Sequence, residues 1–293
     1  MMMTKTTIAI VLAALPAAGA AQDRISRTRP AAPDGVVHVE NPAGSIRVIG
    51  WDRAEVAVSG SLGHGAFGLD LRGDQRRTVV EVETEGNPHG VHSEIEVRVP
   101  AGSDVVIESF AASVSVSEVK GTVTAETVNG DIRVGEAPRE VRAESVNGGV
   151  SVSSRGGRVQ AESVNGPVTV RGAGGEINAS TVNGPLSVTG GTFERGRLET
   201  VNGRILFEAG LAAGGSLDVE TVSGEVELAL PAGTAADFTV STFSGDIRNE
   251  LGPAARRASR YTTEKELAFS TGGGGARVTV ETLSGGIVLR RRQ

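Results

Sequence analysis

Short runs of alternating apolar and polar residues recur along the chain from about residue 104. One set of apolar pairs follows an Asn-Gly step: Ile132 and Val134, Val150 and Val152, Val168 and Val170, Leu186 and Val188, Ile205 and Phe207. A second set precedes the next such step: Val141 and Ala143, Val159 and Ala161, Ile177 and Ala179. Strict alternation places each pair on one face of a short strand. No helix-period pattern appears after the first residues, so an all-β protein is predicted.

A tetrad of the form Thr/Ser-apolar-Asn/Ser-Gly marks each repeat. It occurs at 127–130, 145–148, 163–166, 181–184, 200–203, 221–224, 242–245 and 282–285. The spacings are 18, 18, 18, 19, 21, 21 and 40 residues. Self-similarity at a period near twenty residues is typical of a solenoid. We therefore expect a parallel β-solenoid with about 18–21 residues per coil.

A two-strand coil cannot bury its apolar face or pair its backbone groups alone. Stacked on a neighbour about 4.8 Å away, it does both. Equivalent residues then form columns through the stack, so Val150 is expected directly below Val168. Gly-rich segments such as 154–157 and 172–175 supply the turns between strands.

The tetrad asparagines are expected to form a structural ladder at one corner: Asn129, Asn147, Asn165, Asn183 and Asn202. Asn and Gly tolerate positive φ, so we expect that conformation at the corner. Buried amides would then pass hydrogen bonds from coil to coil. Ser223, Ser244 and Ser284 replace Asn in later tetrads, which suits a corner and weakens a chemical role.

Composition narrows the class of protein further. The chain contains 41 Gly, one Trp, one Tyr and no Cys, and its formal net charge is −6. The lack of Cys excludes disulfides and a lipoprotein anchor. An acidic balance argues against a nucleic-acid partner.

The first 21 residues resemble an export signal. Lys5 precedes an apolar run over 6–15, and Ala18 and Ala20 fit a cleavage rule for a cut after Ala20 or Ala21. The run is too short for a transmembrane helix, which needs about 20 apolar residues. We expect an exported protein, in the periplasm, cell envelope or medium, with no stable membrane span after signal removal.

Four further segments resemble the DUF4097 adhesin-like β-strand-repeat family in composition and order. They are "NPAGSIRVIGWDRAEVAVSG" (41–60), "IEVRVPAGSDVVIES" (95–109), "STFSGDI" (241–247) and "TGGGGARVTVETLSGGIVL" (271–289). The resemblance covers most of the chain after the signal. It implies a right-handed parallel β-solenoid at the cell envelope, with no established catalytic activity.

These features together predict four regions. They are a signal peptide at 1–21, a linker at 22–35, an irregular N-terminal β cap at 36–103 with Trp51, and the solenoid or adhesin-like domain at 104–290. The cap would protect one end of the stack from edge pairing. The long segment 248–275 and Arg290 to Arg292 are expected to blunt the other end.

A glutamate precedes many tetrads, at Glu126, Glu144, Glu162, Glu199, Glu220 and Glu281. Stacked carboxylates would either bind a cation such as Ca²⁺ or form a solvated face screened by Arg142 and Arg197. His89, His92 and Glu94 form a second weak metal pattern. We predict no metal and no cofactor.

An enzyme is the alternative considered for this chain. No Ser lies in a G-x-S-x-G turn, and a β-helix polysaccharide lyase or hydrolase would need convergent carboxylates. Asp131, Asp237 and Asp246 are the candidates, but their positions in the repeat do not converge.

The basic segment Arg256, Arg257, Arg260 and Tyr261 is the candidate partner contact on this acidic protein. The sequence thus predicts a non-enzymatic, adhesin-like scaffold or binding module for an envelope protein or polysaccharide. The alternative is a carbohydrate-active β-helix enzyme. The oligomeric state is left open.

Overall fold

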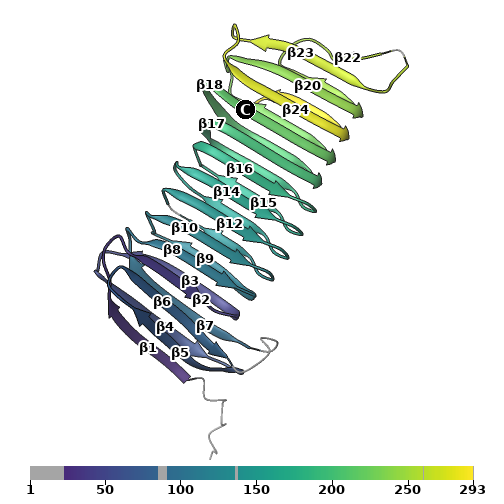
Figure 1. The fold of residues 1–293 in the computed structure, drawn as a ribbon. Helices are drawn as coiled ribbons and strands as arrows, with labels where there is room; N and C mark the ends of the chain where they lie inside the picture. Colours follow the sequence, from purple (N-terminus) through teal and green to yellow (C-terminus); the bar gives the residue numbers. More distant parts are fainter. Residues whose placement is uncertain (1–22, 85–90, 136–137, 260, 293) are drawn as a thin grey trace, which may run out of the picture.

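The computed structural model describes residues 23–84, 91–135, 138–259 and 261–292. All regular structure in these ranges is β, in 25 strands whose pairings join into one large, mostly parallel sheet. The sheet winds into an elongated, solenoid-like rod (Figure 1). The predicted signal peptide at 1–21 lies outside the described residues. No described segment forms a helix long and apolar enough to cross a bilayer.

Each central coil contributes two strands to two stacked files. The first file contains β8 (Asp104–Ser109), β10 (Thr122–Thr127), β12 (Glu140–Ser145), β14 (Arg158–Ser163) and β16 (Gly175–Thr181). The second contains β9 (Ala111–Ser117), β11 (Ile132–Val134), β13 (Val150–Ser153) and β15 (Val168–Arg171). Neighbours within each file pair in parallel, in register.

Longer strands continue both files toward the C-terminus. β17 (Leu186–Asn202) and β18 (Ile205–Ser223) each run through the turn and contribute to both files. Beyond them lie β19 (Val226–Leu230), β20 (Ala236–Ser244), β21 (Ile247–Asn249), β24 (Ala276–Ser284) and β25 (Ile287–Arg291).

The core consists of vertical columns of aliphatic side chains. Val150 pairs with Val168, and both are fully buried at 1% and 0% exposure. The other predicted inward residues, from Val134 to Phe207, are buried as well. Phe193 and Phe207 fill wider coils, with ring centroids 5.9 Å apart. The prediction of in-register stacking is confirmed.

At the N-terminal end, the coil order in space differs from the order in sequence. β2 (Val36–Glu40) and β3 (Ala43–Trp51) lie between the β8–β9 coil and the coil of β6 (Arg77–Thr84) and β7 (Ser93–Pro100). Two antiparallel strands, β4 (Glu55–Leu62) and β5 (Ala66–Gly73), cover this terminal coil. The region therefore closes the end of the stack (Figure 1).

The predicted linker at 22–35 is wrong for residues 23–30. They form β1 (Asp23–Pro30), which pairs antiparallel with β4 along its whole length. Its polar, Arg-rich sequence lacks the alternation seen in the repeats because, of its side chains, only Ile25 packs against the core as an apolar residue. Most of them are exposed.

At the C-terminal end, too, the order of the coils in space differs from their order in sequence. β24 pairs with both β18 and β20, and β25 pairs with both β19 and β21, so the last coil of the chain is inserted inside the stack. Two strands from the long segment form an antiparallel cover on β20: β22 (Arg256–Arg257) and β23 (Lys265–Thr271).

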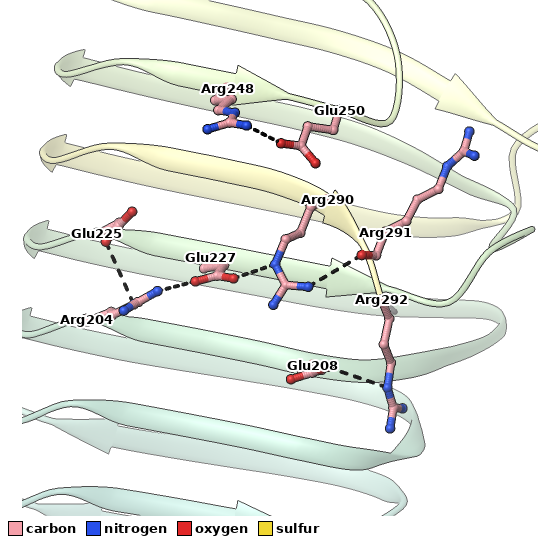
Figure 2. A network of polar contacts seen from close by, with 9 residues as sticks. All are labelled: Arg204, Glu208, Glu225, Glu227, Arg248, Glu250, Arg290, Arg291 and Arg292. Carbon is pink, nitrogen blue, oxygen red and sulfur yellow. Dashed lines mark hydrogen bonds and ion pairs between the residues drawn. The ribbon is translucent and has the colours of Figure 1, made fainter.

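The prediction that Arg290 to Arg292 blunt the end of the rod is therefore wrong. Arg290 donates to Glu227 at 2.5 Å, and Arg292 lies 3.8 Å from Glu208. Figure 2 shows these contacts. Arg204 also pairs with Glu227. These contacts join the inserted C-terminal coil to earlier coils along the second file.

The corner contains an asparagine ladder, but an exposed one. Asn147 Nδ2 donates to Asn129 Oδ1 at 2.9 Å, and the bonds continue through Asn165 (2.9 Å), Asn183 (3.0 Å) and Asn202 (3.1 Å). None of these asparagines has a positive φ. The expectation of buried amides is wrong. The expectation of positive φ is wrong for the asparagines, and among the tetrad glycines it holds only for Gly224 and Gly285, at 157° and 158°.

Glycine is needed in the tetrad for a different reason. A Cβ at Gly166 would lie 2.1 Å from the carbonyl oxygen of Gly148 in the preceding coil, and the same approach recurs at Gly148 and Gly184. Only a residue without a side chain allows two backbones to stack this closely.

Candidate binding groove

A groove of about 1000 Å³ runs along one side of the rod, over the first file of strands and the adjoining corner. The tetrads and the glutamates that precede them supply its walls and floor. It extends from Glu108 near the N-terminal end to Phe243 near the C-terminal end. The repeat thus builds one continuous feature from identical positions in successive coils.

One wall is an acidic file, formed by outward side chains that are in register from strand to strand. In spatial order its members are Glu108, Glu126, Glu144, Glu162, Ser180, Glu199, Glu220, Glu281 and Ser241. All of them line the groove. Register alone therefore confirms that the predicted glutamates stack, with serine interrupting twice.

The other wall is an apolar file, the second residue of each tetrad. In spatial order its members are Val128, Val146, Val164, Val182, Val201, Val222, Leu283 and Phe243. From Val146 onward they are exposed, from 38% at Val182 to 55% at Leu283 and Phe243. At about 4.8 Å per coil, the seven intervals between these eight residues span roughly 34 Å.

The floor is the first residue of each tetrad, a buried Thr or Ser. Ser145, Ser163 and Thr181 donate to the carbonyl oxygens of Gly130, Gly148 and Gly166 at 2.9, 2.8 and 2.9 Å. Each hydroxyl thus binds the closely approaching glycine of the preceding coil. This second ladder fixes the corner in the central coils, whereas the buried hydroxyls of Thr221 and Thr282 have no hydrogen-bond partner among the described residues.

Basic side chains beside the acidic file partly offset its repulsion. Arg142 lies 2.7 Å from Glu144, and Arg197 contacts Glu199 and lies 3.9 Å from Glu220. This is the arrangement expected of a solvated face.

The groove itself remains acidic. Among the described residues, its lining contains no Lys, Arg or His. Glu126 and Glu281 have no ion pair within the described part of the chain. In the same residues, no group of three or more His, Asp or Glu side chains is placed to hold a metal ion.

The histidine pattern falls partly outside the described residues, at His89. His92 Nε2 lies 3.8 Å from Glu94 Oε1, and both side chains are exposed. His64 approaches His92 through the backbone, where its carbonyl oxygen accepts the His92 N–H at 3.1 Å. The described part of this pattern is an exposed pair.

The three candidate catalytic aspartates are not brought together. Asp131 accepts from Gly149 N at 2.9 Å and pairs with Arg133 at 2.8 Å. Asp246 pairs with Lys265, and Asp237 accepts from Ser270 at 2.5 Å. The register of β11, β13, β15, β17, β18, β19, β25 and β21 separates Asp131 from Asp246 by seven coil intervals, or roughly 34 Å.

The predicted basic contact is only partly described. Arg256 and Arg257 lie in β22 with exposed side chains, Tyr261 is 86% exposed, and Arg260 lies outside the described residues. These residues belong to the C-terminal cover, which adjoins the end of the groove: Thr263 donates to the carbonyl oxygen of Phe243 at 2.8 Å, and Glu264 lines the groove. Their role as a partner contact stays a prediction.

The apolar file was not predicted from the sequence, although a signal for it exists. The second tetrad letter is Val, Leu or Phe in all eight copies, at a corner that is otherwise polar. An apolar residue kept at every copy of a turn indicates a stripe that faces either the core or a partner. The first residue of the tetrad is always Thr or Ser, and this regularity likewise indicates the hydroxyl ladder.

Comparison with solved structures gives distant likenesses. A "putative lipid binding protein" from Parabacteroides distasonis ATCC 8503 has a TM-score of 0.43 and 11% identity, with 92% of this chain and 97% of that chain covered. A "putative adhesin" from Bacteroides fragilis NCTC 9343 has a TM-score of 0.42 and 9% identity, with 93% and 98% covered. A "putative cell adhesion protein" from Clostridium sporogenes ATCC 15579 has a TM-score of 0.23 and 8% identity, with 92% and 100% covered.

These likenesses are too weak to carry a functional assignment, and no curated protein matches the chain. The family comparison is stronger. The family model described as Toastrack DUF4097 matches residues 69–290, which include all eight tetrads and both walls of the groove. The chain belongs to the Toastrack DUF4097 family.

Proposed function

We propose that this protein is an exported, non-enzymatic binding module of the cell envelope, built as a right-handed β-solenoid. Its rigid rod displays the groove, which holds an envelope protein or polysaccharide. The adhesin-like names of distant structural neighbours agree with such a role.

One observation carries this proposal: the continuous apolar file. Seven successive members, from Val146 to Phe243, expose at least 38% of their surface, although the chain has buried aliphatic columns elsewhere. Contiguous exposed apolar surface with a polar rim is characteristic of interaction sites. Here the acidic file supplies the rim.

A binding role also suits the rest of the molecule. The aspartates that a polysaccharide lyase or hydrolase would need are separated, and each has its own hydrogen-bonding partner. The repeat gives many equivalent shallow positions rather than one enclosed pocket. Such a surface favours an elongated ligand over a small substrate.

The test is binding of the purified protein to envelope fractions and glycan arrays. The groove variant Val146→Thr/Val164→Thr/Val182→Thr keeps side-chain shape while removing apolar surface. The control Ser151→Ala/Thr169→Val/Ser187→Ala changes outward positions on the second file. We expect binding to be lost in the groove variant and kept in the control. Equal binding by wild type and groove variant would refute the groove as the binding face.

A further inference from the structure

The groove combines two surfaces that one type of ligand would satisfy. Aliphatic or aromatic side chains of a ligand would pack on its apolar wall, and positively charged groups of the ligand would pair with its acidic wall. Glu126 and Glu281 have no ion pair within the described residues, and the groove lining contains no basic residue. A partner that brings Lys or Arg beside apolar side chains would complete both walls.

A second copy of this chain does not fit face to face. An isologous pairing of antiparallel rods would place the acidic file of one copy against that of the other, and one of parallel rods would place it against the apolar file. Carboxylates repel in the first pairing, and in the second they would lose water without gaining a partner. Charge complementarity therefore favours a different, basic partner.

The spacing of the coils indicates the conformation of that partner. Members of the apolar file recur about every 4.8 Å along the rod. One turn of an α-helix advances 5.4 Å, whereas same-face side chains of an extended chain recur about every 6.6–6.8 Å. A helix therefore stays close to register over several coils, and an extended peptide does not.

We infer that the groove binds a basic amphipathic helix of a partner polypeptide, an inference that rests on the proposed function. Apolar side chains of the helix pack on Val146, Val164 and Val182. Lys or Arg side chains on its flank pair with Glu126, Glu144 and Glu162. The roughly 34 Å length of the apolar file corresponds to about 22 helical residues at 1.5 Å each.

The experiment uses three dye-labelled peptides of about 22 residues with the purified protein. The first places Leu and Lys at helical period, the second has the same composition with strict alternation, and the third replaces Lys by Glu. Fluorescence anisotropy measures affinity, and circular dichroism measures helix formation on binding. The first peptide should bind and gain helicity, and its affinity should fall with added salt.

Two protein variants locate the contact. Glu126→Gln/Glu144→Gln/Glu162→Gln should lower the affinity of the first peptide by about tenfold, because three charge pairs of modest strength are lost. Glu94→Gln/Glu140→Gln/Glu194→Gln changes net charge equally outside the groove and should leave affinity within about twofold. The groove valine variant should also weaken binding.

Three results would overturn the inference. These are equal or tighter binding of the alternating peptide, binding of the Glu peptide, or equal losses in the two glutamine variants. Self-association that the valine variant abolishes, measured by light scattering, would make a second copy the occupant instead. If the peptides fail but the valine variant still loses envelope binding, the helix inference fails and the proposed function stands.

Discussion

At Gly166 the backbones of two coils come closer than any side chain would permit. The Gly148 carbonyl oxygen lies 2.1 Å from where a Cβ would be, and it also accepts the hydroxyl of Ser163 at 2.8 Å. Residue 166 must therefore be Gly for steric reasons, although its φ is not of the left-handed kind. The buried hydroxyl and the small glycine act together at this corner, and also at the corners of Ser145 and Thr181.

Gly166→Ala should destabilise the protein by about 3 kcal/mol, because the methyl group can only be placed by separating two coils. Gly156→Ala is the matched control, since a Cβ there has no atom within 4 Å. It should change stability by less than about 1 kcal/mol. Urea unfolding measures both. Similar losses in the two variants would contradict the close-approach argument.

The hydroxyl ladder gives a second prediction. Thr181→Val keeps the shape of a buried side chain but leaves the Gly166 carbonyl oxygen without its 2.9 Å hydrogen bond. The expected loss is about 1–3 kcal/mol in the free energy of unfolding. Thr169→Val, at a half-buried outward position on β15, should have little effect. Equal stability of Thr181→Val and wild type would show that the ladder is dispensable.

At the scale of the strands, alternation was the reliable signal. It predicted the inward residues of β11 to β16 because stacked coils must bury one face of every strand. It could not reveal β1, most of whose side chains are exposed and in which Ile25 is the one apolar residue packed against the core. The apolar file was missed because exposed apolar residues break the same inward rule.

The insertion of β24 and β25 could not be predicted from the tetrads. Coils that end in Thr-apolar-Ser-Gly have equivalent tetrads, so the residues of the tetrad do not determine which coil lies beside which. The 40-residue gap before the last tetrad was the available sign of an excursion. Ion pairs such as Glu227 with Arg290 distinguish the correct neighbour.

That ion pair predicts a pH dependence of stability. The hydrogen bond from Arg290 lowers the pKa of Glu227 below 4.5, despite some opposing burial. Its contribution is therefore complete above about pH 4.5 and is lost as pH falls through the lowered pKa. Glu227→Gln should cost about 1 kcal/mol at pH 7, and the difference from wild type should vanish in acid.

Chemical denaturation at several pH values measures this difference. Asp246→Asn is the comparison, because Lys265 also lowers the pKa of Asp246, but that carboxylate is exposed. We expect no measurable change in this variant. A cost of Glu227→Gln that persists unchanged at pH 3 would contradict the ion-pair explanation.

For the whole molecule, the repeat converts one corner into a groove that runs from the β8–β9 coil to β20. Its continuity depends on coils that are out of sequence order, since Leu283 lies between Val222 and Phe243. Covers at both ends leave the rod without a simple open coil. The side of the rod, rather than its ends, is thus the surface available for an elongated partner.

Double electron–electron resonance along the apolar file tests this arrangement most directly, because the chain has no native Cys. Nitroxides would be attached at residue 146 together with residue 222, 283 or 243. Coil spacing predicts distances of roughly 19, 24 and 29 Å, in that order. A shorter distance from Val146 to Phe243 than to Leu283 would contradict the inserted coil, and distances without regular steps would contradict the continuous groove.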